Sequence, residues 1–212
     1  MKRLSGCMSL AVVFTGCTLC PRTQLERAAA AGDVPEIERL LRSGAPDRLA
    51  ALISAARAGG VAAIPVLVRH GADPNGTSGV NGWNVLMHAI HKNQAEGVRA
   101  LLQSGADPNA RAGGTTPLAM AAGYGQTEIV RILLAHNAHA DAQALERAIL
   151  GVADIDNWTT AKCQDDTVRL IVERNPALVT AELLSRVDSK LNRCPAVRGA
   201  VTRPEPQVRR TL

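Results

Sequence analysis

The 212-residue sequence predicts an all-α fold, a solenoid of about five stacked helix pairs. Three observations lead to this prediction. A leucine followed by small residues recurs five times, a second apolar segment follows each copy, and aromatic residues make up only 2% of the chain. A β-sandwich or barrel relies on more aromatic and β-branched residues than this. The composition therefore favours thin helices built on alanine and leucine, which can approach one another closely.

The first helix of each repeat is predicted from a leucine followed three residues later by alanine, and then by a small or apolar residue. The recurring residues are Leu25, Leu52, Leu86, Leu118 and Leu145. Because this spacing places leucine and alanine on one helix face, the alanines lie where the next repeat packs closest. Glycine three positions further on, at Gly32, Gly59 and Gly125, suits the left-handed residue that ends a helix.

The second helix of each repeat is predicted from segments such as "VRALLQSGA" and "VRILLAHNA". Their apolar residues recur at helical offsets, and glycine follows at Gly44, Gly71 and Gly105. After two of these glycines the sequence reads "ADPN", and proline and asparagine are turn formers. Each repeat is therefore expected to end in a turn that leads to the next repeat.

The fourth repeat carries a family resemblance. Its residues Gly114-Thr115-Thr116-Pro117-Leu118, followed by Ala121-Ala122 and Gly125, closely match the ankyrin-repeat consensus, with Ala119 where that family usually has histidine. The sequence resembles the ankyrin-repeat family over residues 24–178. The expected repeats are 24–46, 47–79, 80–112, 113–141 and 142–178, followed by a C-terminal cap at 179–194.

This resemblance implies a monomeric scaffold that binds a protein partner in a concave groove. In the family, partner contacts come from the finger turns and from the exposed ends of the first helices. The positions that match are Arg57, Val80, Asn81, Trp83, His91, Lys92, Ala112, Thr115 and Tyr124. Trp, Tyr and Arg are the usual interface anchors. The alternatives left open are that Trp83 packs on a neighbouring finger and adds only stability, and that His91 and Lys92 lie on a solvated helix end.

Catalytic and metal-binding motifs are not evident. His88-x-x-His91 and His136-x-x-His139 have a spacing that a metal could use, yet His88 lies in a helix pattern, His136 lies at a helix end, and no cysteine or acidic third ligand repeats the arrangement. The sequence contains no G-x-S-x-G, P-loop or H-E-x-x-H motif. We therefore expect no enzyme activity, no metal, no cofactor and no small-molecule substrate.

The net charge of +5 comes from the two ends of the chain. Lys2 and Arg3 lie at the start, and five arginines lie between Arg193 and the C-terminus, so the part between them is close to neutral. No basic stripe marks a nucleic-acid-binding face. Residues 195–212 contain three prolines and no apolar periodicity, which predicts a disordered basic tail.

The first residues resemble a bacterial lipoprotein signal. Lys2-Arg3 precedes the apolar run from Met8 to Phe14, and Gly16-Cys17 follows. The resemblance implies a signal peptide at 1–16, a lipid on Cys17, a leash at 17–23, and a location at the periplasmic face of the bacterial envelope, in the outer membrane. Plain secretion, a membrane anchor and a cytosolic chain with an apolar start remain alternatives, although the run is shorter than the roughly 20 residues of a spanning helix.

Two further cysteines, Cys163 and Cys194, could form a disulfide if the chain is exported. Closing about 30 residues would add roughly 3–4 kcal/mol in the loop-entropy model; two free buried thiols are the alternative. The expected function is a non-enzymatic, envelope-tethered protein-binding scaffold, in one version an immunity-type inhibitor of a periplasmic toxin. The alternatives are a structural or stress-related adaptor without one tight partner and, as an outlier, a thiol redox protein that uses Cys17 and Cys20.

Overall fold

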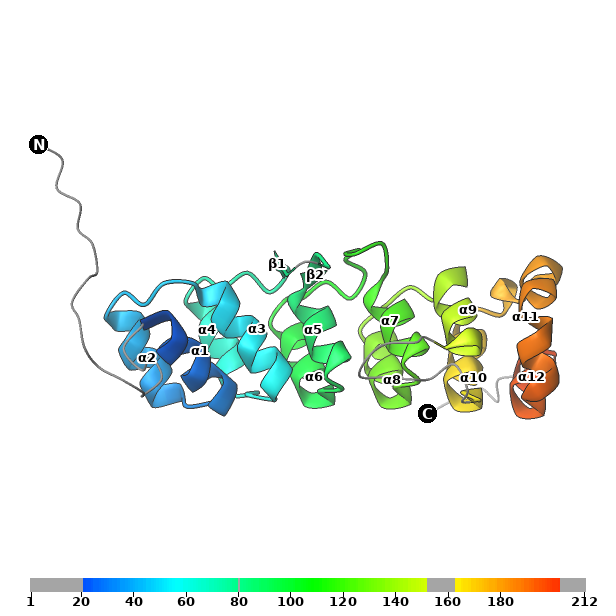
Figure 1. The fold of residues 1–212 in the computed structure, drawn as a ribbon, viewed down its shortest axis with the longest axis horizontal. Coiled ribbons are helices and arrows are strands. Elements are labelled where there is room, and N and C mark those ends of the chain that lie inside the picture. Colours follow the sequence, from blue (N-terminus) through cyan, green and yellow to red (C-terminus); the bar gives the residue numbers. More distant parts are fainter. Residues whose placement is uncertain (1–20, 80, 152–162, 203–212) are drawn as a thin grey trace, which may run out of the picture.

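The computed structural model describes residues 21–79, 81–151 and 163–202, and these residues form six helix pairs stacked along one axis (Figure 1). Each first helix packs on the first helix of the next pair, and each second helix packs on the next second helix. The first-helix layer consists of α1 (Pro21–Ala31), α3 (Arg48–Ala58), α5 (Val85–His91), α7 (Pro117–Gly123), α9 (Ala142–Leu150) and α11 (Ala181–Arg193).

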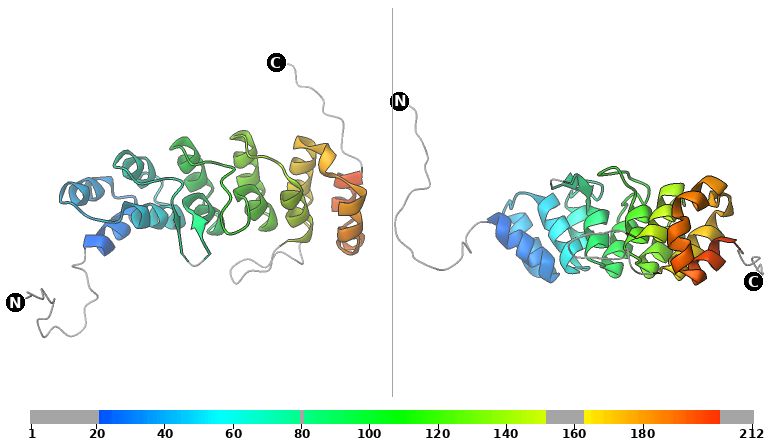
Figure 2. Two further views of the ribbon diagram at one scale, coloured as in Figure 1. Left: turned by 90° about the horizontal axis from the view of Figure 1, so that it is seen from above. Right: turned by 45° about the vertical axis from the view of Figure 1, so that its right-hand side comes forward.

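The second-helix layer lies beside it, and the two layers are separated clearly when the molecule is viewed from above (Figure 2). It consists of α2 (Val34–Arg42), α4 (Ala63–Arg69), α6 (Ala95–Gln103), α8 (Thr127–Ala135), α10 (Asp165–Arg174) and α12 (Pro195–Thr202). A short 3-10 helix, Pro176–Leu178, links α10 to α11. The only strands among the described residues, β1 (Thr77–Ser78) and β2 (Trp83–Asn84), form an antiparallel hairpin in the finger before α5.

The expected all-α solenoid is confirmed, and the recurring leucines form its centre. All five are at most 1% exposed, within one continuous apolar core that runs through the stack. Close approach between pairs depends on small residues. A Cβ atom added at Gly60 would lie only 2.1 Å from the carbonyl oxygen of Ala29 in α1, so a larger residue cannot occupy this position without moving the backbone.

Polar residues at the start of several first helices set where those helices begin. Asn84, Thr116, Asp141 and Thr180 each accept a hydrogen bond from the backbone N–H three residues later, which satisfies a donor that the helix leaves unpaired. Pro117 occupies the first turn of α7, where a missing N–H costs nothing. The Thr-Pro-Leu sequence therefore forms a helix start for reasons that are local.

Asparagine side chains join consecutive repeats at the turns that follow the second helices. The Asn75 side chain donates to the carbonyl of Gly105 (3.3 Å) and accepts from the backbone N–H of Asp107 (2.8 Å). Asn109 makes the same two hydrogen bonds one repeat further on, to Asn137 (3.1 Å) and His139 (2.8 Å). The "ADPN" segments thus fix each repeat relative to its successor as well as turning the chain.

The C-terminal part corrects one expectation. Helix α11 lies within the predicted cap at 179–194, but residues 195–202 form a second helix, α12, where the sequence predicted a disordered tail, so that 181–202 make a sixth helix pair. Helix α12 packs against α10 and buries Val197, Ala200 and Val201. Pro195 is its first residue, a position that proline tolerates. The prediction of disorder is therefore wrong for residues 195–202, and the rest of the predicted tail, 203–212, lies outside the described residues.

A disulfide joins Cys163 to Cys194, with the two sulfur atoms 2.04 Å apart. It links the residue two positions before α10 to the residue that immediately follows α11. Cys194 is 2% exposed whereas Cys163 is exposed, so the link runs from the buried end of α11 to the surface beside α10. The structure contains the pairing that sequence analysis weighed against two free thiols.

The predicted signal peptide and Cys17 lie outside the described residues, as does the first part of the leash. Among the helices of the described part of the chain, none has the length and apolarity needed to span a membrane.

Candidate protein-binding face

Four aromatic and imidazole rings from two adjacent repeats form a cluster on the first-helix layer. Trp83 of β2 lies 5.1 Å from His91 and 5.8 Å from His88, measured between ring centroids, and both histidines belong to α5. Tyr124, immediately after α7, has its ring 5.8 Å from that of His91 and its hydroxyl 3.1 Å from His91 Nδ1, a hydrogen-bonding distance. We call Trp83, His88, His91 and Tyr124 the ring cluster.

The finger hairpin determines where Trp83 lies. Pairing of Ser78 with Trp83 positions the indole beside α5. On its other side the next finger approaches closely: a Cβ atom added at Gly113, which has a φ of +58°, would lie 3.1 Å from Trp83 Cδ1 and 2.7 Å from the Asn81 carbonyl oxygen. Trp83 therefore packs on the neighbouring finger, as the stability alternative expected. Its side chain is nevertheless only half-buried, so part of the ring faces solvent.

His88 has a distinctive electrostatic environment. Burial lowers its pKa below the ordinary value of 6.5, and a hydrogen bond from its Nε2 to the carbonyl of Ser78 (3.4 Å) opposes this shift. Coulombic interactions with Arg57 and His91 lower the pKa of His88 further. The lowered pKa favours the neutral form of this half-buried imidazole, and the Arg57 guanidinium is its charged neighbour.

Comparison with known proteins agrees with this architecture. A family model described as ankyrin repeats, in three copies, matches residues 25–112, and a model for a single ankyrin repeat matches residues 113–145. The chain belongs to the ankyrin-repeat family. The crystal structure of the human ASB11 ankyrin repeat domain is similar, with a TM-score of 0.56 and 25% identity, over 71% of this chain and 68% of that chain. No curated protein matches the sequence. As an ankyrin-repeat protein, the chain has the architecture of a protein–protein interaction scaffold.

The predicted contact residues of this ankyrin-repeat protein divide into two groups. Arg57, near the end of α3, and Asn81, in the hairpin turn, are exposed, whereas His91 and Lys92 at the end of α5 are half-buried, as Trp83 is. Val80 lies outside the described residues. These exposed and half-buried residues come from α3, from the hairpin and from α5. Trp83 contacts His91, and Arg57 lies close enough to His88 to act on its pKa.

The other three predicted contacts are buried, which corrects their assignment as exposed interface residues. Ala112, Thr115 and Tyr124 are 9%, 4% and 9% exposed. Ala112 and Thr115 exchange backbone hydrogen bonds across the tight turn of the fourth finger, which leaves their side chains facing the protein. Tyr124 is covered by His91. It therefore supports the surface from below and is not an exposed anchor.

His88 belongs to this surface, although sequence analysis did not assign it as a contact. It lies three residues before His91, so the two imidazoles share one helix face. This spacing drew attention to the pair as a metal candidate. However, the described residues contain no group of three His, Cys, Asp or Glu side chains placed to hold a metal ion.

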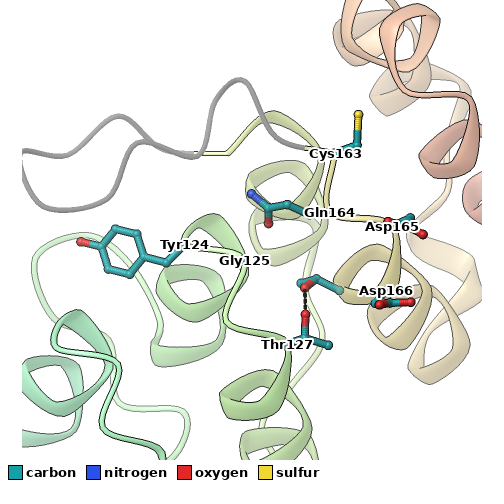
Figure 3. Close-up of a pocket in the computed structure, with 8 residues that line it drawn as sticks. Tyr124, Gly125, Thr127, Cys163, Gln164, Asp165 and Asp166 are labelled. Carbon is teal, nitrogen blue, oxygen red and sulfur yellow. Dashed lines mark hydrogen bonds between the residues drawn. The ribbon is translucent and has the colours of Figure 1, made fainter.

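A separate cavity of about 180 Å³ lies between the end of α7 and the start of α10 (Figure 3). Thr127 and Thr167 are joined across it by a 2.8 Å hydrogen bond between their hydroxyls. Gln164 donates to the Gly123 carbonyl at 3.3 Å, while Gln164 Oε1 is buried without a partner in the described structure. Tyr124 points away from Asp166 in Figure 3, so the lining groups do not converge on one point. The cavity is an inter-repeat gap, and it does not resemble a catalytic site.

Proposed function

We propose that the chain binds one protein partner through the surface formed by Arg57, Asn81, Trp83, His88 and His91. The observation that carries the proposal is the ring cluster itself. Trp83 is held between Gly113 and His91, so its orientation is fixed before any partner arrives. A rigid, partly exposed indole loses little conformational entropy on binding, which is why tryptophan is so often an interface anchor.

Site-specific photo-crosslinking in the producing cells tests this proposal. A photoreactive amino acid replaces Arg57 on the proposed surface or, as a control, Arg131 on α8, which is 58% exposed on the second-helix layer. We expect one dominant crosslinked protein from position 57 and none from position 131. Binding of that protein should weaken by roughly 2 kcal/mol or more in Trp83→Ala, the typical loss for a central anchor.

Equal crosslinking from both positions, or unchanged binding by Trp83→Ala, would place the interface elsewhere on the molecule. Since Trp83 also packs on a neighbouring finger, Trp83→Phe serves as the second variant. Phenylalanine keeps an aromatic ring in this position while removing indole contact area. A correctly folded Trp83→Phe protein with undiminished affinity would contradict the anchor role even if the alanine variant were unstable.

We further propose that the protein is exported and held in the bacterial envelope by a lipid on Cys17. The Cys163–Cys194 disulfide supports export, because disulfides persist in oxidising compartments and are rare in the cytosol. Intact mass of the membrane-extracted protein reports signal cleavage and acylation together. The mass of the complete unprocessed chain would refute this part of the proposal.

A narrower version is an immunity-type inhibitor that covers a toxin delivered to the periplasm. A scaffold with a fixed surface suits tight inhibition, because little has to be ordered on binding. If the crosslinked partner is a toxin, its periplasmic expression should kill cells that lack this chain and spare cells that have it. A partner that is harmless on its own would favour a housekeeping adaptor.

A further inference from the structure

The charges on the first-helix layer indicate what kind of partner the surface accepts. Equivalent residues of the five repeats can be found by counting from the recurring leucine of each first helix. In the third repeat, positions two and five after the leucine face the finger hairpin, since Trp83 packs on His88 and on His91. Position six lies four residues after position two and therefore on the same side of the helix. The same three positions are compared in the other repeats. We call these positions the finger-side face.

The finger-side face carries cationic and imidazole side chains but no carboxylate in any of the five repeats. Its three positions in successive repeats are Arg27, Ala30 and Ala31; Ser54, Arg57 and Ala58; His88, His91 and Lys92; Met120, Gly123 and Tyr124; and Arg147, Leu150 and Gly151. The described fingers add Arg111, which is exposed. Basic groups therefore recur along the face, on both sides of the ring cluster.

Acidic residues of the same helices lie at a different position. Glu26 and Glu146 both come one residue after the leucine, at a position that is buried in the three middle repeats. Glu146 pairs with Arg186 of α11, with 3.3 Å between Oε2 and Nη2. The negative charges of these two end repeats thus lie off the finger-side face.

The second-helix layer shows the opposite pattern, because there acids and bases alternate in ion pairs. Arg99 of α6 lies 3.5 Å from Glu96 and 3.6 Å from Glu128 of α8, and Glu128 also contacts Arg131 at 3.5 Å. By contrast, Arg57 is exposed and forms no ion pair with any described residue. Arg57 also lies close enough to the ring cluster to lower the pKa of His88, although burial is the larger cause of that shift.

We propose that the partner presents an acidic segment, with Asp or Glu side chains flanking an apolar or aromatic residue, to the finger-side face around Arg57 and Trp83. This inference rests on the proposed function and specifies its partner chemistry. The carboxylates would lie beside Arg57 and the neighbouring basic positions, and the apolar residue would lie on the exposed edge of Trp83. Such charge complementarity speeds association and rejects basic competitors.

A polypeptide fits this face better than a nucleic acid does. The basic groups are separated by alanine, serine, methionine and glycine positions, so they do not form the dense stripe that tracks a phosphate backbone. The rings of Trp83, His88, His91 and Tyr124 form one cluster at the junction of two repeats, whereas base stacking along a strand needs aromatic groups at intervals.

The inference can be tested by selecting a displayed library of random peptides for binding to the immobilised full-length protein. We expect the enriched peptides to contain more Asp and Glu than the unselected library, together with an apolar or aromatic residue. Their affinity should fall about tenfold or more between 0.1 M and 1 M salt, where the screening length falls from about 10 Å to about 3 Å. Arg57→Gln should weaken them about fivefold, and the matched Arg131→Gln control on α8 should leave them unchanged.

Each other outcome has a defined meaning. Enriched peptides that depend on Trp83 but lack acidic residues would overturn the acidic-partner inference and leave the proposed binding surface intact. Peptides that bind Trp83→Ala and Trp83→Phe as well as the parent would contradict the proposed surface and the inference with it. Failure to enrich any sequence, or tighter binding of a single-stranded DNA of the same length at this face, would also overturn the inference.

Discussion

Removal of the Cys163–Cys194 disulfide should destabilise the protein by an amount that can be calculated from its position. The two cysteines are 31 residues apart. In the chain-entropy model, closing a loop of this length costs the unfolded chain about 12 cal/mol/K, or about 3.7 kcal/mol at 25 °C. The Cys163→Ser/Cys194→Ser double variant should lose about this much unfolding free energy. For a chain of this size, the melting temperature should then fall by roughly 7–15 °C.

Urea unfolding followed by far-UV circular dichroism measures this loss, and hydrogen exchange locates it. The loss of protection should be greatest in α11 and α12, because the disulfide ties the end of α11 to the segment before α10. Reductant should bring the parent protein to the stability of the double variant and leave the variant unchanged. A variant within about 1 kcal/mol of the parent, or protection lost equally in α1 and α3, would refute the reasoning.

Three further changes test the packing and electrostatics of the repeats. Gly60→Ala should lower the free energy of unfolding, measured with urea, by about 3 kcal/mol or more, because its Cβ would meet a backbone carbonyl of α1. Gly44→Ala has open space around it and a φ of +82°, so it should lower this free energy by only about 1 kcal/mol. Equal losses in the two variants would contradict the steric argument. Asn109→Ala removes both inter-repeat hydrogen bonds of this side chain, so it should lower the free energy of unfolding by about 1–2 kcal/mol and expose the backbone amide of His139 to hydrogen exchange. Unchanged protection of that amide would show that Asn109 does not hold the two repeats together. The lowered pKa of His88 means that the unfolded chain binds a proton more readily, so stability should fall as the pH drops below about 6.5 through the folded-state pKa; His88→Gln should flatten this part of the stability profile, and an unaltered profile would contradict the assignment.

The repeat core was predictable from the sequence because its determinants are local and periodic. The leucine and alanine positions of each first helix, and the "ADPN" turns, follow from helix periodicity and turn chemistry. The sixth pair was missed although its pattern is present in the sequence. Val197, Ala200 and Val201 have helical spacing, but this short pattern was not recognised as apolar periodicity, and the three prolines of 195–212 favoured a disordered tail. Here packing against α10 decides the structure, and composition alone does not predict such packing.

The candidate surface was predicted less well, because exposure depends on neighbouring repeats. Family resemblance named Arg57, Trp83 and His91 as partner contacts, and the structure places Trp83 against His91 and Arg57 near His88; their role in binding stays a prediction. The resemblance could not reveal that Tyr124 lies beneath His91, since this depends on the side chain that the preceding repeat supplies at the facing position. Similarly, the absence of carboxylates from the finger-side face becomes apparent only once the helices are aligned side by side.

The position of the disulfide also determines which end of the solenoid should unfold first under a pulling force. In a repeat stack each pair is held mainly by its nearest neighbours. A load applied at the N-terminal end reaches α1 and α2 first, and no disulfide joins these helices to the next pair in the described structure. Helix pairs should therefore detach in sequence order under tension, beginning with α1 and α2. The residues between Cys163 and Cys194 should not extend, because the disulfide carries the force past this 31-residue span. The surface around Trp83, in the third repeat, would be lost before this fastened end.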